Sequence, residues 1–469
     1  MKFRNYIFGF FTSYISIGLS FGQVSDSLNR QVLSFPEYLG LVKTYHPTIK
    51  QANLRLTMAE GNLLKSRGAF DPYFSSNLER KDFKGSEYYD NLNAVFAIPT
   101  WFGVELKSSY ENNSGEFLNP QNTTPLDGLY NIGVSVPLGR DLLINERMAN
   151  LKKAKAFMLE TEANRRLIVN DILSNASEAY FRWSEAKIKE AVYQRAYENA
   201  LERANAVART ILQGQEAAID SVEANILVQS RKLDLENASL KANKARLVVS
   251  NFLWLENIPL EINSNAIPVL PEDDEIAAFL NLDMTTDLNN HPKIVALENK
   301  LKGLEVDVDL ARNNLLPRVE LGYNFLSEDV NNLDNFNTEN YKAMLNIKFP
   351  LFLRKERGEL KLSKAYFENA QLDFVNESLI LRNKIEAALL EIESYTSQSE
   401  IISQMVRKFD TMLSAEERKF EAGESSIFLI NFREQKLLES QIKEIDLKVQ
   451  ELESYLGLFN VLGISDLAE

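Results

Sequence analysis

Two very long stretches of the chain, residues 140–213 and residues 359–422, contain neither glycine nor proline. Because these two residue types interrupt helices, each stretch is predicted to be a continuous α-helix. At 1.5 Å per residue, about 70 residues make a rod of roughly 105 Å, far longer than one compact domain. Apolar residues of the first stretch recur in alternating steps of four and three, as in a coiled-coil seam, at Ile144, Met148, Leu151, Ala154 and Met158.

The sequence contains a tandem duplication. The sequence His-Pro-Thr-Ile at residues 46–49 returns as His-Pro-Lys-Ile at residues 291–294, and Pro72 maps onto Pro317 at the same spacing. One repetition indicates a pseudo-symmetric unit rather than a many-repeat solenoid. Proline suits the first turn of a helix and pushes the residue before it out of helical conformation, so both histidines are interpreted as structural.

Each long helix is predicted to reverse at a glycine. Gly214 and Gly423 are followed by further helical stretches, residues 215–257 and 424–456. Glycine readily takes the left-handed conformation that ends a helix, so each marks a tight turn between antiparallel partners. The result is two helical hairpins.

Both halves also contain a segment in which apolar and polar residues alternate, residues 73–136 and residues 318–350. A period of two predicts strands with one apolar and one polar face. Four strands are expected in the first segment and two in the second. Such strands suit a barrel wall between lipid and water, although a half-buried soluble sheet has the same pattern.

The N-terminus predicts export. Residues 1–22 carry Lys2 and Arg4, a mostly apolar run and a small-x-small ending at Gly22, which is typical of a signal peptide. An uncleaved anchor is the alternative, but the run is shorter than the roughly 20 residues of a spanning helix. No later stretch is long and apolar enough, so the mature chain could span a membrane only as a β-barrel.

Composition excludes several functions. Acidic residues number 66 against 52 basic ones, a net charge of −14, which argues against a nucleic-acid partner. The chain has no cysteine, which excludes disulfides and thiolate metal sites, and its two histidines are too few for a histidine cluster. No catalytic, cofactor or metal site is predicted. Trp183, at helical spacing from Ala176 and Ala179, is interpreted as packing rather than as a stacking platform for substrate.

These features, with the segment Gly-Gln-Glu-Ala-Ala-Ile-Asp-Ser-Val-Glu-Ala at residues 214–224, resemble the outer membrane efflux (TolC-like) family over essentially the whole mature chain. The resemblance implies a homotrimer in the cell outer membrane. Its strands would build one shared transmembrane β-barrel, and its helical hairpins would build a tunnel across the periplasm. A periplasmic adaptor (membrane fusion) protein and an inner-membrane pump or ABC transporter are the implied partners, and the pump would supply the energy.

The resemblance also implies that the far end of the tunnel stays closed until the adaptor and pump engage it. The residues assigned to this tip and to adaptor docking flank the two glycine turns: Gly214, Glu216, Asp220, Gly423, Glu424 and Ser425.

The second turn departs from the family pattern, because Leu429 and Phe432 stand where some members place aspartates that ring the closed tip. Asp220, Glu216 or Glu424 would then have to line the constriction. We hypothesise that Asp220 helps to hold the tip closed, which unchanged conductance of Asp220→Ala would contradict. The alternative for these carboxylates is helix capping, since a carboxylate in the first turn stabilises a helix by roughly 0.3–1 kcal/mol.

The barrel is a second departure. Six strands per chain predict an 18-stranded barrel in a trimer, whereas the family usually has four strands per chain and 12 per trimer. In this arrangement Trp101 and Phe102 lie in a turn at the periplasmic aromatic girdle. The alternative is that the additional hairpin, residues 91–110, forms an extracellular flap.

The predicted organisation is mainly α with membrane β. It comprises a signal peptide (1–22), a first repeat (23–257, with strands 73–136 and hairpin 140–257), a linker or equatorial segment (258–290) and a second repeat (291–469, with strands 318–350 and hairpin 356–460). The predicted function is a passive, gated outer-membrane conduit of a tripartite efflux pump or type I secretion system, exporting small molecules or polypeptides. A periplasmic coiled-coil scaffold without a pore is the alternative, and an enzyme is disfavoured.

Overall fold

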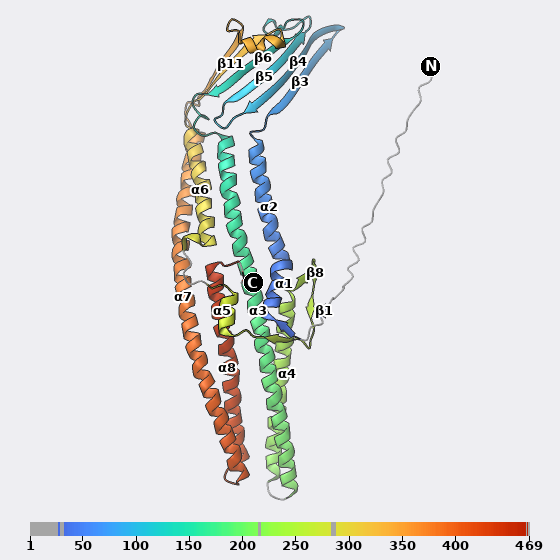
Figure 1. The fold of residues 1–469 in the computed structure, drawn as a ribbon, viewed down its shortest axis with the longest axis vertical. Coiled ribbons are helices and arrows are strands. Elements are labelled where there is room, and N and C mark those ends of the chain that lie inside the picture. The colour runs from blue at the N-terminus through green and yellow to red at the C-terminus, as the bar shows by residue number, and fades with distance from the viewer. Residues whose placement is uncertain (1–26, 29–31, 214–216, 283–287, 466, 468–469) are drawn as a thin grey trace, which may run out of the picture.

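The chain folds into an elongated molecule with a β-sheet at one end and the tips of two helical hairpins at the other (Figure 1). The structure, a computed structural model, describes residues 27–28, 32–213, 217–282, 288–465 and 467. The predicted fold class, very long helical hairpins joined to a set of strands, is confirmed. The predicted signal peptide, residues 1–22, lies outside the described residues.

The helices follow the same order in the two halves. Those of the first half are α1 (Phe35–Tyr45), α2 (Pro47–Gly68), α3 (Glu146–Leu212) and α4 (Ala218–Ser250). Those of the second half are α5 (Asp273–Phe279), α6 (Pro292–Asn313), α7 (Arg354–Glu421) and α8 (Ile427–Leu462). Short 3-10 turns are η1 (Pro120–Asn122), η2 (Leu288–Asn290) and η3 (Val330–Asn335).

Four helices lie side by side near the sheet, and four lie side by side near the tips. Along α3, α2 packs on the half near the sheet and α4 on the half near the tip, while α6 and α8 occupy the matching places along α7. Contacts of α3 with α6 and α8 join the two halves. The array therefore has two free edges, one formed by α2 and α4 and the other by α7.

Several helix ends differ from the prediction, and in the second half α7 begins at Arg354 rather than at residue 359 and α8 ends at Leu462 rather than at residue 456. The first long helix begins at Glu146 rather than at residue 140, because Asp141 has a left-handed backbone (φ 80°) and the Asn145 side chain caps the helix by accepting from the Met148 N–H. The helix after the first tip ends at Ser250 rather than at residue 257. There β7 (Trp254–Leu255) and β8 (Ile258–Pro259) form a small hairpin.

Both His-Pro pairs begin helices, as predicted. The Nδ1 atoms of His46 and His291 accept hydrogen bonds from the backbone N–H groups of Thr48 (3.3 Å) and Lys293 (3.1 Å). Burial lowers the pKa of both imidazoles below the ordinary 6.5. The two histidines therefore act as neutral helix caps.

The main core lies halfway along the molecule, around the middle of α3. Short parallel pairs cover it, β1 (Ser27–Leu28) with β9 (Glu261–Ile262) and β2 (Val32–Ser34) with β10 (Ile267–Val269). The Tyr180 hydroxyl lies 2.7 Å from the carbonyl oxygen of Leu33 and 2.9 Å from that of Val269, which ties β2 and β10 to α3. Trp183 is fully buried in this core, so its interpretation as a packing residue is confirmed.

All six predicted strands are present in one antiparallel sheet, in the order β12-β11-β6-β5-β4-β3. They are β3 (Tyr73–Phe83), β4 (Ser86–Pro99), β5 (Glu105–Ser114), β6 (Leu129–Pro137), β11 (Arg318–Ser327) and β12 (Tyr341–Lys348). The second half supplies only β11 and β12, and β11 pairs with β6, so the two halves share one continuous sheet.

Candidate functional site

The six-stranded sheet has one apolar and one polar face. Residues paired across antiparallel strands point to the same side, so the register defines both faces. The apolar face carries Phe74, Leu78, Leu92, Phe96, Ile98, Leu106, Ile132, Val134, Val136, Leu321, Phe325, Leu345 and Ile347. The polar face carries Asn77, Glu79, Asn93, Glu105, Lys107, Asn131, Ser135, Glu320, Asn324, Asn346 and Lys348. Polar residues interrupt the apolar face at Ser76 of β3 and at Ser108 and Asn112 of β5.

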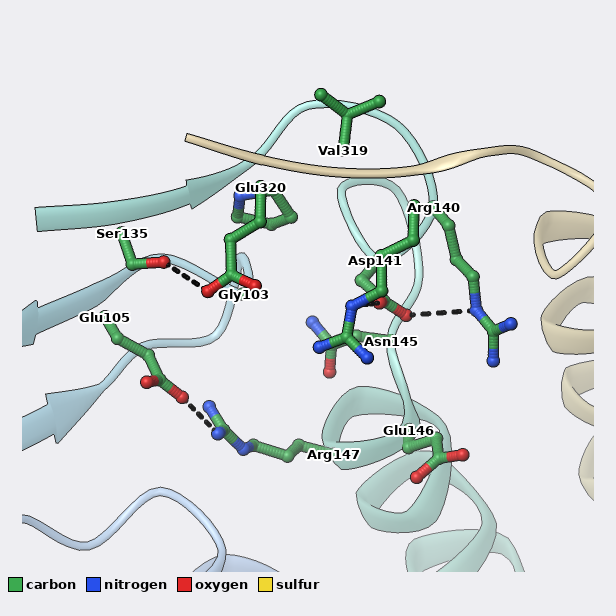
Figure 2. A pocket seen from close by; sticks show the side chains of 12 residues that line it. Gly103, Glu105, Ser135, Arg140, Asp141, Asn145, Glu146, Arg147, Val319 and Glu320 are labelled. Carbon is green, nitrogen blue, oxygen red and sulfur yellow. Dashed lines mark hydrogen bonds and ion pairs between the residues drawn. The ribbon is translucent and has the colours of Figure 1, made fainter. Parts of the chain in front are cut away.

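The polar face ends in a charged pocket of about 310 Å³ where the strands meet the helices. In Figure 2, Glu105 of β5 pairs with Arg147 of α3, and the Ser135 hydroxyl donates to Glu320 (2.8 Å). Asp141 lies between two arginines, but burial is the stronger influence and raises the pKa of its carboxyl. This pocket joins the polar lining of the sheet to the start of the helical array.

The turn between β4 and β5 packs against the helices. The Trp101 ring stacks on Phe70 with ring centroids 5.5 Å apart, and the Trp101 carbonyl accepts from the Asn145 side chain (3.2 Å). The turn lies at the helix end of the sheet, as predicted, and helix side chains cover part of the Trp101 ring, while its place in an aromatic girdle stays a prediction. Phe102 is 65% exposed.

The second tip is a glycine turn, as predicted. Gly423 has a left-handed backbone (φ 77°), and its N–H and that of Glu424 donate to the last carbonyls of α7. The Ser425 hydroxyl donates to Glu416 Oε1 (2.6 Å), and Arg433 lies 3.5 Å from Glu416 Oε2. The Ser425 hydrogen bond and then the Arg433 side chain lower the pKa of Glu416. Glu416, which the sequence did not single out, thus links α7, the turn and α8.

At the first tip, Gly214 and Glu216 lie outside the described residues. The Asp220 carboxylate accepts from the Ala217 backbone N–H (3.2 Å), as a capping residue of α4 does. Its place among the predicted tip residues stays a prediction. Glu424 is exposed, and so are Leu429 and Phe432 at 38% and 46%.

Ion pairs connect the two hairpins along the contact of α3 with α8. Each has its cation on α3 and its carboxylate on α8: Arg182–Glu453 (3.3 Å), Lys189–Asp446, and Arg203–Glu434 (2.7 Å). Burial opposes the charge of Lys189, but hydrogen bonds to Asp446 and Glu185 outweigh it and raise the pKa of the ammonium. The pair nearest the tip is well covered, since the side chains of Arg203 and Glu434 are 19% and 7% exposed.

The free edge at α4 carries an unpartnered apolar stripe. Its members recur every seven residues and are 49–68% exposed: Ile219, Ile226, Leu233, Leu240 and Leu247. On the opposite edge, α7 also exposes large apolar side chains, among them Leu372, Val375, Leu379, Leu390 and Ile401. A seven-residue apolar repeat is the seam by which helices pair.

Within the described ranges, no group of acidic or histidine side chains is arranged to hold a metal ion. Of the helices that the structure describes, none combines the length and apolar character needed to cross a membrane.

The chain is similar in sequence to outer-membrane exporters. Residues 286–464 match the family described as "Outer membrane efflux protein". The solvent efflux pump outer membrane protein SrpC of Pseudomonas putida is 20% identical over 359 residues, which cover 74% of this chain and 73% of that protein. The pyoverdine export outer membrane protein OpmQ of Pseudomonas aeruginosa is 20% identical over 318 residues, covering 68% and 66%.

Solved structures share the fold. The structure of CusC superposes with a TM-score of 0.66 at 14% identity and covers 91% of each chain. The CmeC outer membrane channel of Campylobacter jejuni gives 0.63 at 15% identity, covering 91% of this chain and 85% of that one. The open state of the MtrE outer membrane channel of Neisseria gonorrhoeae gives 0.64 at 16% identity, covering 92% and 88%.

Proposed function

We propose that the chain belongs to the outer membrane efflux protein family and is the outer-membrane channel of an efflux pump or type I secretion system. It is a passive, gated conduit, and the strands cross the outer membrane while the helices extend into the periplasm. We assign it no catalytic role, and the energy for export comes from an inner-membrane pump or ABC transporter that reaches it through a periplasmic adaptor protein.

The two-faced sheet above the long helices is the observation that carries this proposal. A face that is mostly apolar across the sheet suits lipid, and a polar face on the other side suits a water-filled lumen. A scaffold in the aqueous periplasm would gain nothing from exposing such an apolar surface.

The free edges support a closed ring of copies, and the homotrimer is the ring size that the family resemblance implies. The outermost strands β3 and β12 run in opposite directions, so β3 of one copy can pair antiparallel with β12 of the next. The same two edges continue into the helices, where the apolar stripe of α4 faces α7 of a neighbouring copy. Pairing of all edges removes exposed strand edges and apolar stripes together.

Gating is assigned to the hairpin tips. The tip residues Gly214, Glu216, Asp220, Gly423, Glu424 and Ser425 form the adaptor-docking end in this proposal. The ion pair Arg203–Glu434 holds the second hairpin against the first in the closed channel. The adaptor and pump would open the channel by separating these contacts.

The test is purification from outer membranes in detergent, followed by mass determination and planar-bilayer recording. We expect a trimer with small, mostly closed currents. A matched pair of β12 variants checks the sheet, since an arginine at the lipid-facing Leu345 costs roughly 2–4 kcal/mol at mid-membrane, whereas one at the neighbouring Asn346 faces water. Leu345→Arg should impair insertion, and Asn346→Arg should insert and alter ion selectivity. A buffer-soluble protein without conductance would favour the scaffold instead.

A further inference from the structure

The β4–β5 hairpin is additional to the four strands per chain that the family resemblance implies. We propose that this hairpin crosses the membrane as part of the wall, so that three copies close an 18-stranded barrel with lipid against the hairpin's apolar face. This inference rests on the proposed channel function. The alternative, an extracellular flap, would leave the hairpin outside the lipid band.

The lower turn of the hairpin is fixed at the helix end of the sheet. Trp101 packs in a cluster with Leu63, Leu151 and Ala154 of α2 and α3, and its carbonyl accepts from Asn145. Gly103 fits closely there, because a Cβ on it would lie 2.9 Å from the Asp141 carbonyl oxygen. A hairpin anchored to the helices at this end traverses the same height as its neighbours.

The side chains of β4 continue both faces of the sheet, whereas β5 adds Leu106 but also Ser108 and Asn112 to the apolar face, opposite Phe96 and Leu92. On the apolar side, Phe96 of β4 pairs with Phe74 of β3, and Ile98 pairs with Leu106 of β5. On the polar side, Val95 lies between Ser75 and Ser109. A flap in water would have no reason to keep its apolar residues in register with those of the membrane wall.

The strand directions permit closure with the hairpin included. The additional pair lies inside the sheet, between β3 and β6, and it pairs with both over most of its length. Two added strands leave the edge strands β3 and β12 antiparallel, so the join between copies is unchanged. Closure without the hairpin would require breaking both of these ladders.

An 18-stranded wall also fits the helical tube below it. Barrel diameter rises roughly linearly with strand number, so 18 strands make a bore about 1.5 times as wide as 12. With strands 4.8 Å apart and tilted by about 40°, the circumference is roughly 110 Å. A ring of 12 helices, four from each copy, at about 9 Å spacing has nearly the same circumference. The membrane exit is therefore wide, and the tips set the resistance.

Single cysteines test the inference, because the chain has none of its own. Phe96→Cys and Val95→Cys place adjacent thiols on opposite faces of β4. In trimers reconstituted in phosphatidylethanolamine–phosphatidylglycerol vesicles, a charged maleimide should label Cys at 95 from the lumen. It should label Cys at 96 at least roughly tenfold more slowly, because lipid covers that face.

Leu345→Cys and Asn346→Cys in β12 form the control pair. Alternation at both pairs supports the 18-stranded wall. If the control pair alternates but 95 and 96 react equally fast, the hairpin lies outside the lipid and the 18-stranded barrel is refuted, while the channel function stands. Equal labelling at both pairs would refute the channel function itself.

Discussion

Removing the arginine of the tip ion pair should open the channel. Arg203 on α3 binds Glu434 (2.7 Å) and the Asn431 side chain (2.9 Å) on α8. In Arg203→Gln, Glu434 stays 95% buried without its cation, and separation of α8 from α3 lets water reach the carboxylate. The substitution therefore destabilises the closed state relative to the open one.

The magnitude follows from the burial of the pair. Exposed ion pairs contribute about 0–1 kcal/mol, and removing one partner of a buried pair costs about 3–5 kcal/mol. The side chains of this pair are 19% and 7% exposed, so removal of Arg203 should cost an intermediate amount, about 2 kcal/mol. Since 1.4 kcal/mol is a factor of ten, the open-to-closed ratio should rise roughly 30-fold. Glu434→Gln should have a smaller effect, because the more exposed Arg203 can reach water.

Planar-bilayer recording of the purified trimer measures the open probability directly. Arg195→Gln, an exposed arginine on the same helix, is the matched control and should leave the currents unchanged. The exchanged pair, Arg203→Glu with Glu434→Arg, should restore closure. If Arg203→Gln forms a trimer whose open probability equals that of Arg195→Gln, the pair does not hold the channel closed.

Three further outcomes are expected. Burial lowers the pKa of His291 below 6.5, so the neutral imidazole that caps α6 stabilises the fold above about pH 6.5. This stabilisation is lost as the pH falls through the lowered pKa of the folded state. Because asparagine also caps helices, His291→Asn should weaken the acid-induced drop in melting temperature. Leu233→Glu on the α4 stripe should dissociate the trimer in detergent, as measured by light scattering, whereas the charge control Lys232→Glu should not. Gly423→Ala should lower the unfolding free energy by about 1 kcal/mol, because Gly423 has a left-handed backbone. Gly358→Ala should raise it by roughly 0.5–1 kcal/mol, because glycine destabilises a helix interior such as that of α7. Denaturant titrations measure both changes.

The order of elements could be predicted because each depends on local signals. The absence of glycine and proline predicted α3 and α7, and the period-two alternation predicted six strands. The ends were harder to predict. Residues 140–145 have helical composition, yet the Asn145 cap and the hydrogen bond from the Arg140 N–H to the Pro317 carbonyl in the other half keep them out of α3. That contact joins residues far apart in sequence, so no local pattern contains it.

The functional residues were predictable only where a turn marks them. Gly423 was found because a helix reversal requires a special backbone. Arg203, Glu416 and Glu434 were missed because each is one charge among many on a helix surface. Only the packing of α3 on α8 distinguishes Arg203 and Glu434, and only the packing of α7 on the turn and α8 distinguishes Glu416. A usable signal exists after the fact, since the α3 cations Arg182, Lys189 and Arg203 are separated by multiples of seven residues and so share one face.

The edges of the sheet are covalently continuous with the edges of the helical array, so the two interfaces between copies depend on each other. β3 continues from α2, and β12 leads into α7, so any neighbour that pairs with β3 must also bring its α7 against α2 and α4. A hairpin inserted inside the sheet, between β3 and β6, leaves both edges intact, whereas a strand added outside β3 or β12 would separate the sheet edge from the helix edge. The interior position of β4 and β5 is therefore the one that lets the wall widen while the same two surfaces still join the copies.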